Sequence, residues 1–142
     1  MKRSKNEFLV DTSILIEHLE CENEFSILEA ALTNSLVFTT VINASELFVI
    51  MKNRHIDGEI KSLLSVINVL GIHSRYSLGV PIFSDLTQNY SDAIFCVVAQ
   101  MNKLPILTFN EEKYKNTGLK IYNGLEVIND FRQSDWFRLV NS

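Results

Sequence analysis

The chain has 142 residues, of which 46% are hydrophobic and 21% charged, and it carries a formal net charge of −4 with a pI near 5.3. The length and apolar share suit one globular domain, and the acidic balance argues against a protein that grips nucleic acid through a general basic surface. Two cysteines are too few for a disulfide framework, and no apolar stretch is long enough for a signal peptide or a membrane span. We therefore expect a single cytoplasmic domain over residues 1–142, with a polar C-terminal tail.

The first half of the chain predicts strands that are each followed by helices. In chain order, the expected elements are a strand at 7–11, helices at 13–20 and 23–33, a strand at 36–39, a helix at 41–51 and a helix from 57 onwards. Thr40 is placed to cap the helix that follows it, and Asp57 and Glu59 favour the start of the next one through the helix dipole.

The second half repeats this alternation, except at 73–88, where Gly79 and Pro81 interrupt the secondary-structure pattern and make its signal weak. The expected elements are a strand at 69–72, a helix from 81, a buried helix at 91–102, a strand at 105–108, a helical turn at 111–115, a strand at 119–122 and a helix at 125–132. Strands that alternate with helices predict parallel βαβ units. The fold class is therefore α/β, a three-layer α/β/α domain with a central parallel sheet.

Polar side chains fall at comparable places along this pattern. Asp11 ends the first strand, Glu46 and Asp92 lie early in helices, and Asn110 follows a late strand. Taken singly, each has an ordinary explanation as a helix cap, a solvated residue, a dipole partner or a turn residue. Because the carboxyl ends of parallel strands and the starts of the following helices share one edge of the sheet, we expect Asp11, Glu46 and Asn110 to converge there. Asp92 joins them if its helix begins on the same side.

Three carboxylates in one cleft repel one another unless a cation is present. Ligands that are all oxygen suit Mg²⁺ or Mn²⁺ rather than zinc. The sequence has no glycine-rich loop of the kind that cradles phosphate. The acids therefore point to metal-dependent hydrolysis of a phosphodiester bond.

Four segments, taken in order, resemble the PIN-domain nucleases, especially the toxin ribonucleases of VapBC-type toxin–antitoxin pairs. They are residues 9–13 (LVDTS), 43–47 (NASEL), 91–94 (SDAI) and 107–110 (LTFN). The resemblance implies a sheet of about five parallel strands and Mg²⁺- or Mn²⁺-dependent endoribonuclease cleavage of RNA. It also implies a homodimer and a cognate antitoxin as partner, with no membrane.

The resemblance also assigns residues to the site. Asp11, Glu46 and Asp92 match the three main catalytic acids and metal ligands, with Asn110 as a weaker ligand. Thr12, Ser13 and Thr108 would orient the acids. The chain departs from the family pattern after the last strand, because Asn110 and Lys113 stand where many PIN domains have an acid.

Basic and aromatic side chains near these segments are candidates for contact with RNA. The candidates for phosphate binding are Lys52, Arg54, Lys113 and Lys115, and those for stacking on bases are Tyr114 and Trp136. For most of these basic residues, an ordinary solvated surface is the simpler explanation. For the two aromatic residues, core packing or a partner surface is as plausible as stacking on bases.

Two alternatives to the ribonuclease stay open. One is a PIN domain that has lost catalysis and binds RNA or a protein partner. The loss would follow from Asn110 and Lys113, which stand where the family often has an acid. The other is a haloacid-dehalogenase-like phosphatase, whose first strand also ends in an aspartate. That family normally has a second aspartate two residues later, where this chain has Ser13.

Overall fold

A parallel sheet of five strands forms the centre of the part that the structure describes, residues 6–22 and 25–133 of a computed structural model. The strands are β1 (Asn6–Val10), β2 (Ser35–Thr40), β3 (Asn68–Leu70), β4 (Ile106–Thr108) and β5 (Ile121–Asn123). Their order across the sheet is β3-β2-β1-β4-β5, and every neighbouring pair runs parallel. The expected α/β class and five-stranded parallel sheet are confirmed.

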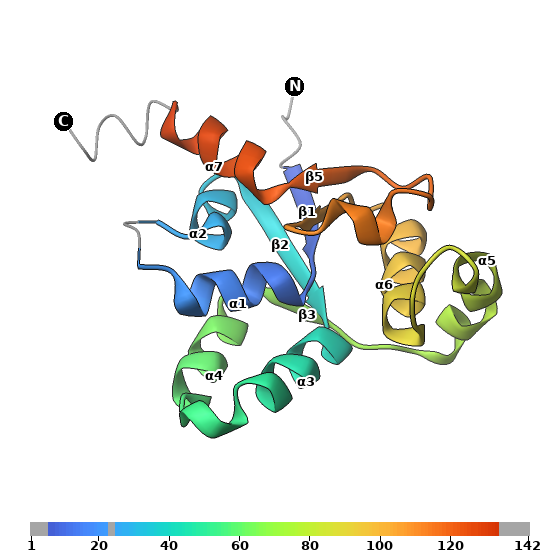
Figure 1. Cartoon of the computed structure of the whole chain (residues 1–142), viewed down its shortest axis with the longest axis horizontal. Coiled ribbons are helices and arrows are strands. Elements are labelled where there is room, and N and C mark those ends of the chain that lie inside the picture. Colours follow the sequence, from blue (N-terminus) through green and yellow to red (C-terminus); the bar gives the residue numbers. More distant parts are fainter. Residues whose placement is uncertain (1–5, 23–24, 134–142) are drawn as a thin grey trace.

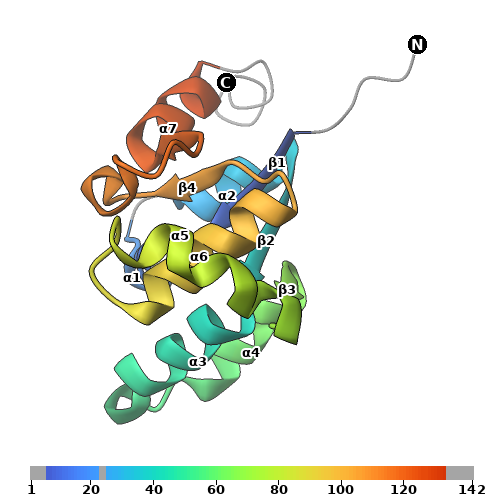
Figure 2. The ribbon, with the colours of Figure 1, turned by 90° about the vertical axis from the view of Figure 1, so that its right-hand side faces the viewer.

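Helices cover both faces of this sheet (Figures 1 and 2). The α-helices are α1 (Thr12–Glu20), α2 (Ile27–Leu32), α3 (Val41–Ile50), α4 (Asp57–Ser65), α5 (Val80–Ser84), α6 (Tyr90–Met101) and α7 (Gly124–Arg132). Short 3-10 helices are η1 (Lys52–Arg54), η2 (Ser74–Gly79) and η3 (Glu111–Tyr114). None of the described helices has both the length and the apolar character that a membrane span requires.

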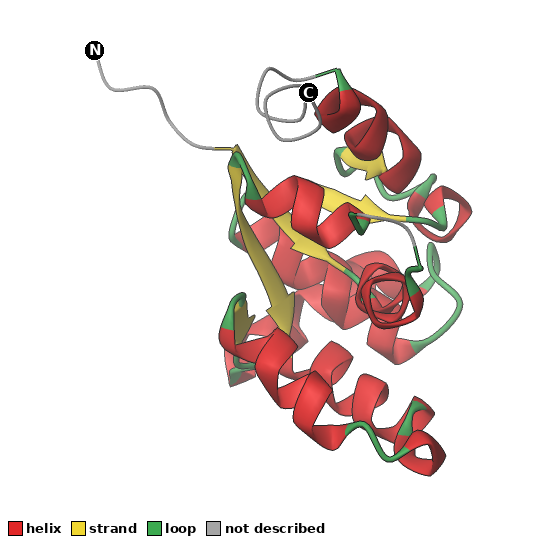
Figure 3. Ribbon diagram, turned by 90° about the vertical axis from the view of Figure 1, so that its left-hand side faces the viewer, coloured by secondary structure: helices red, strands yellow, loops and turns green. Residues whose placement is uncertain are grey.

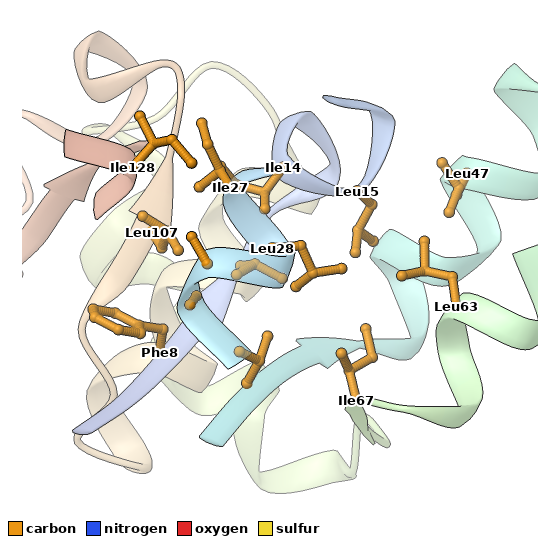
Figure 4. Close-up of a cluster of buried hydrophobic side chains, with 14 of the residues drawn as sticks. Phe8, Ile14, Leu15, Ile27, Leu28, Leu47, Leu63, Ile67, Leu107 and Ile128 are labelled. Carbon is orange, nitrogen blue, oxygen red and sulfur yellow. The ribbon is translucent and has the colours of Figure 1, made fainter. Parts of the chain in front are cut away.

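Alternating side chains of the central strands divide the core into two apolar layers. Phe8 and Val10 of β1 point into the layer made with α1, α2, α3, α4 and α7, which Figure 4 shows in close-up. Leu9 points the other way, into a layer made mainly with α5 and α6. Because residues 8–10 of β1 are buried on both faces, they form a continuous apolar run, as strands of parallel sheets do. Figure 1 shows the strands between α1 and α2 on one side and α5 and α6 on the other, and Figure 3 shows the sheet from the side of α1 and α2.

The direction in which successive strands are added to the sheet changes between β1 and β4, which makes this the topological switch point. The chain builds outward from β1 to β2 and β3, then returns to add β4 and β5 on the other side of β1. In open α/β sheets the crevice beside the carboxyl ends of the strands at such a switch point is where ligands bind. Asp11 and Thr108, at the ends of β1 and β4, flank this point.

Capping residues set several helix boundaries that the apolar pattern places only roughly. The second helix begins at Ile27, later than expected, because Ser26 and Glu29 form a reciprocal capping box there. Thr40 caps α3 as expected, with its hydroxyl accepting from the Asn43 amide at 3.2 Å. Residues 23–24, where the second helix was expected to start, and the tail from 134, including Trp136, lie outside the described residues.

Two further differences concern weak segments. The interrupted stretch before α6 forms η2 and then α5 (Figure 2), so the helix begins at Val80 rather than Pro81. The last strand begins at Ile121 rather than 119, because Ile121 is the first residue that pairs with β4. Asn123 then caps α7, its side chain accepting from the Leu125 amide at 2.8 Å.

A pair of glycine substitutions tests the packing of η2 on α6. A Cβ at Gly79 would lie 2.8 Å from Cγ1 of the fully buried Val97, whereas one at Gly71 would meet nothing within 4 Å. We expect Gly79→Ala to lower the free energy of unfolding by about 1–3 kcal/mol through overpacking. Gly71→Ala is the control and should raise it by up to about 1 kcal/mol, because alanine restricts the unfolded chain. Equal effects in urea denaturation would contradict this packing.

Candidate functional site

The Asp11 carboxylate is the most heavily bonded acid of the site and is only 3% exposed. Its Oδ1 accepts from the Ser13 amide at 3.1 Å and from the Ser13 hydroxyl. Its Oδ2 accepts from the Thr108 hydroxyl at 2.6 Å and from the Tyr114 hydroxyl at 2.9 Å. A carboxylate has about four acceptor positions, so α1, β4 and η3 together occupy those of Asp11.

Asp11 is also the N-cap of α1, since one of its partners is the amide two residues ahead. The cap and the site are therefore the same carboxylate. Ser13 extends the arrangement, because its hydroxyl also accepts from the backbone amide of Phe109 at 3.2 Å. This contact joins the start of α1 to the segment that follows β4.

Glu46 joins this edge through a chain of polar side chains. The Thr40 hydroxyl donates to Asn43 at 2.6 Å, the Asn43 amide group donates to the Thr12 hydroxyl at 3.0 Å, and Thr12 donates to Glu46 Oε1 at 3.3 Å. Thr40 and Asn43 are buried and Glu46 is half-buried. This series of hydrogen bonds links the end of β2 to Thr12, the residue after Asp11. It therefore orients Glu46 toward the end of β1.

Asp92 lies in the first turn of α6 and is 7% exposed. Its Oδ1 forms an ion pair with Nζ of Lys113 at 3.3 Å. Its Oδ2 is buried and has no hydrogen-bond partner among the described residues. A buried carboxylate oxygen in that condition costs free energy unless something binds it, which makes this atom the clearest place for a ligand.

The negative charges of Asp11 and Asp92 help to raise the pKa values of two buried side chains, Tyr114 and Cys96. Burial, followed by the charge of Asp11 and the hydrogen bond to it, raises the pKa of Tyr114 far above its ordinary value, and Asp92 adds to the effect. Burial and the charge of Asp92 raise the pKa of Cys96 to about 12. Asp11 and Asp92 thus both act on the Tyr114 hydroxyl, which stays protonated.

The structure does not bring all of the remaining predicted residues to this edge. Asn110 is exposed, and its backbone amide donates to the Thr108 hydroxyl at 2.9 Å. Lys115 pairs with Glu112 at 2.7 Å. Lys52 and Arg54 lie on η1, after the C-terminal end of α3, and Arg54 pairs at 3.3 Å with Glu20, the last residue of α1, away from the start of that helix at Asp11.

Of the alternatives for Tyr114, base stacking or core packing, the structure shows core packing. Its ring is 1% exposed, packs 5.6 Å from the Phe95 ring between centroids, and turns its hydroxyl to Asp11. A tyrosine that follows a strand can serve either a surface or a core, and the sequence offers no signal that separates the two. Asn43 was likewise not among the residues predicted for the site. Its position three residues after the capping Thr40 indicates a contact with that cap, and the structure shows this contact.

The oxygen donors at this edge decide whether a divalent ion fits it. Among residues 6–22 and 25–133, no group of three or more His, Cys, Asp or Glu side chains lies close enough together to hold a metal ion. The three acids therefore share an edge without forming a three-carboxylate cluster. Mg²⁺, however, is commonly held by one or two carboxylates and keeps several waters. The unpartnered, buried Oδ2 of Asp92 fits an ion of that kind.

Comparison with known proteins identifies the family. The family model described as the PIN domain matches residues 8–119, most of the chain, and the protein belongs to this family. The match decides between the PIN resemblance and the haloacid-dehalogenase alternative in favour of the former. No curated protein matches the chain in sequence.

Solved structures share the fold at low sequence identity. One is a toxin–antitoxin complex from Klebsiella pneumoniae, with TM-score 0.68, 22% identity, and coverage of 82% of this chain and 96% of that one. Another is VapBC-1 from nontypeable Haemophilus influenzae, with TM-score 0.70, 16% identity, and coverage of 84% and 98%. A third is VapBC2 from Rickettsia felis bound to a promoter DNA fragment, with TM-score 0.69, 15% identity, and coverage of 82% and 98%.

Removal of the Tyr114 hydroxyl should destabilise the protein in a manner that depends on pH. Because the folded-state pKa is raised, the contribution of this group to stability is present below the unfolded pKa of about 10 and falls as pH rises above it. We expect Tyr114→Phe to cost about 1.5–3 kcal/mol near pH 8, through the lost bond to a carboxylate. The deficit should shrink toward pH 11, as measured by urea denaturation.

Thr108→Val is the matched control, because it removes another donor to Asp11 but no group that titrates in this range. Its deficit should not shrink in the same way as pH rises. A Tyr114→Phe deficit as constant with pH as that of the control would contradict the arrangement.

Proposed function

We propose that the protein is a metal-dependent endoribonuclease and the toxin of a type II toxin–antitoxin pair. The observation that carries the proposal is the pair of buried aspartates beside the switch point of a PIN-domain sheet. One of them, Asp92, has a buried oxygen that no described residue contacts. Membership of the PIN family supports a nuclease, and the low-identity neighbours described as VapBC support a toxin.

In this proposal Asp11 and Asp92 hold Mg²⁺ or Mn²⁺, with Glu46 and the weaker ligand Asn110 at the side. A divalent ion bound there lowers the pKa of a coordinated water and offsets negative charge on the phosphoryl group. Ser13 and Thr108 hold the Asp11 carboxylate in one orientation through hydrogen bonds from two elements.

Glu46 has a different task, because it is less buried than the two aspartates and Thr12 holds it by a single bond at 3.3 Å. It is suited to accept a proton from water or to hold an outer water in place. Asn43 supports it by fixing the Thr12 hydroxyl.

The partners of the protein follow from the same proposal. RNA phosphates would meet cations of the surface, for which the candidates are the exposed Lys52, Arg54 and Lys115 and the half-buried Lys113. A cognate antitoxin is proposed because one neighbour is described as a toxin–antitoxin complex. The homodimer is proposed from the resemblance to the PIN-domain toxins, and the cytoplasmic location from the low number of cysteines.

One observation favours a second candidate function. Lys113 already neutralises the charge of Asp92 without a metal. A PIN domain that binds RNA or a protein partner without cutting would be compatible with such a pair, and cleavage assays separate the two functions.

The direct test is cleavage of a mixed RNA substrate with Mg²⁺, Mn²⁺ or EDTA. We expect cleavage by the wild-type protein with a divalent ion and a loss of at least about 100-fold in Asp11→Asn and Asp92→Asn, because each variant removes a charged ligand of the ion that stabilises the transition state. Asp85→Asn, at the exposed end of α5, is the control and should cleave as the wild type does. Circular dichroism would verify that each variant is folded.

Cleavage that survives both EDTA and Asp92→Asn would contradict the metal mechanism. An absence of cleavage with every ion, by folded protein, would favour the binding module instead. The toxin assignment has its own measurement, since induced expression should arrest growth of a bacterial host and Asp11→Asn should relieve that arrest.

A further inference from the structure

Lys113 is the basic side chain most closely connected to the candidate site. It comes from η3, whose next residue, Tyr114, is buried and bonded to Asp11. Its own backbone amide donates to the Asn110 carbonyl at 3.2 Å. These contacts fix the backbone on both sides of Lys113, so its ammonium group reaches Asp92 from a constrained position rather than from a loose surface loop.

The neighbouring acids do not compete strongly for this ammonium group. Glu111 accepts from the Asn123 amide group at 2.6 Å, and Glu112 pairs with Lys115 at 2.7 Å. Asp92 is therefore the acid that Lys113 contacts, with Nζ 3.3 Å from Oδ1. The Lys113 side chain is 33% exposed, whereas that of Asp92 is 9% exposed, so the pair sits at the boundary between the interior and solvent.

The two oxygens of Asp92 are in different conditions. Oδ1 has the lysine, and Oδ2 is buried with no hydrogen-bond partner in the described part of the chain. One ammonium group thus compensates the charge of the carboxylate but leaves half of its acceptor capacity unused. A cation that bound Oδ2 would lie close to the Lys113 ammonium group, and the two positive charges would repel each other.

We propose that Lys113 is a built-in counter-cation that competes with the divalent ion for Asp92 and thereby sets a weak metal affinity. The inference rests on the metal site of the proposed function. Lysine suits this competition, because its ammonium group is a compact charge on a flexible stem that can withdraw to solvent when the ion enters. In the metal-free protein the same group keeps a buried carboxylate from being unpaired.

Mn²⁺ binding measured by isothermal titration calorimetry on the full chain tests the competition. Lys113→Met removes the charge and keeps the stem, and we expect it to bind Mn²⁺ about tenfold more tightly than the wild type, a change that one nearby charge can supply. Lys115→Met is the matched control two residues along, on an exposed pair, and should leave Mn²⁺ affinity unchanged. Lys113→Gln keeps a donor without the charge, and serves if the methionine variant does not fold.

Thermal unfolding gives a second readout. In EDTA, Lys113→Met should unfold at a lower temperature than the wild type, because Asp92 is left without its ion pair. Mn²⁺ should then raise the unfolding temperature of the variant more than that of the wild type. A merely structural lysine would give the first effect without the second.

The outcomes separate this inference from the proposed function. Equal Mn²⁺ affinity in the wild type and Lys113→Met, or weaker binding by the variant, would overturn the competition and leave the metal site in place. No Mn²⁺ binding by any folded variant would overturn both.

Discussion

Asp11 keeps a carboxylate in the protein interior, and the surrounding fold supplies a donor for each of its acceptor positions. Without those donors a buried charge would be strongly unfavourable. Ser13 contributes from the start of α1, Thr108 from the end of β4 and Tyr114 from η3, so one side chain ties three separate parts of the chain together. The central position of β1 makes this possible, because β4 lies directly beside it in the sheet.

The same edge holds two further acids under different conditions. Glu46 is half-buried and reached through Thr12, whereas Asp92 is buried and only partly satisfied. Groups whose surroundings differ in this way are suited to different tasks in one reaction. Asp11 is rigid and saturated, so a ligand that binds it must share or displace one of its donors. Asp92 has an oxygen available, and its lysine is the group most easily moved.

The alternation of apolar and polar segments was enough to predict the parallel sheet, because buried strands such as β1 and β4 are short apolar runs that end in polar residues. It also placed Asp11 and Glu46 at one edge, with Asp92 beside them if its helix began on the same side. It could not predict the ion pair of Lys113 with Asp92 or the contact of Tyr114 with Asp11. Both depend on the path of the single turn η3, where a shift of one residue would exchange the buried and exposed side chains. The start of the second helix was misplaced for a similar local reason, the capping box at Ser26.

In the proposed function, the edge between β1 and β4 binds a divalent ion through Asp11 and Asp92. The most direct test is a crystal structure of the protein soaked in Mn²⁺, with anomalous diffraction at the manganese edge. We expect an anomalous peak about 2 Å from a carboxylate oxygen of Asp92, with Asp11 as a second ligand and the Lys113 ammonium group displaced. A fully ordered site at saturating Mn²⁺ that shows no peak there, with Lys113 still on Asp92, would contradict it.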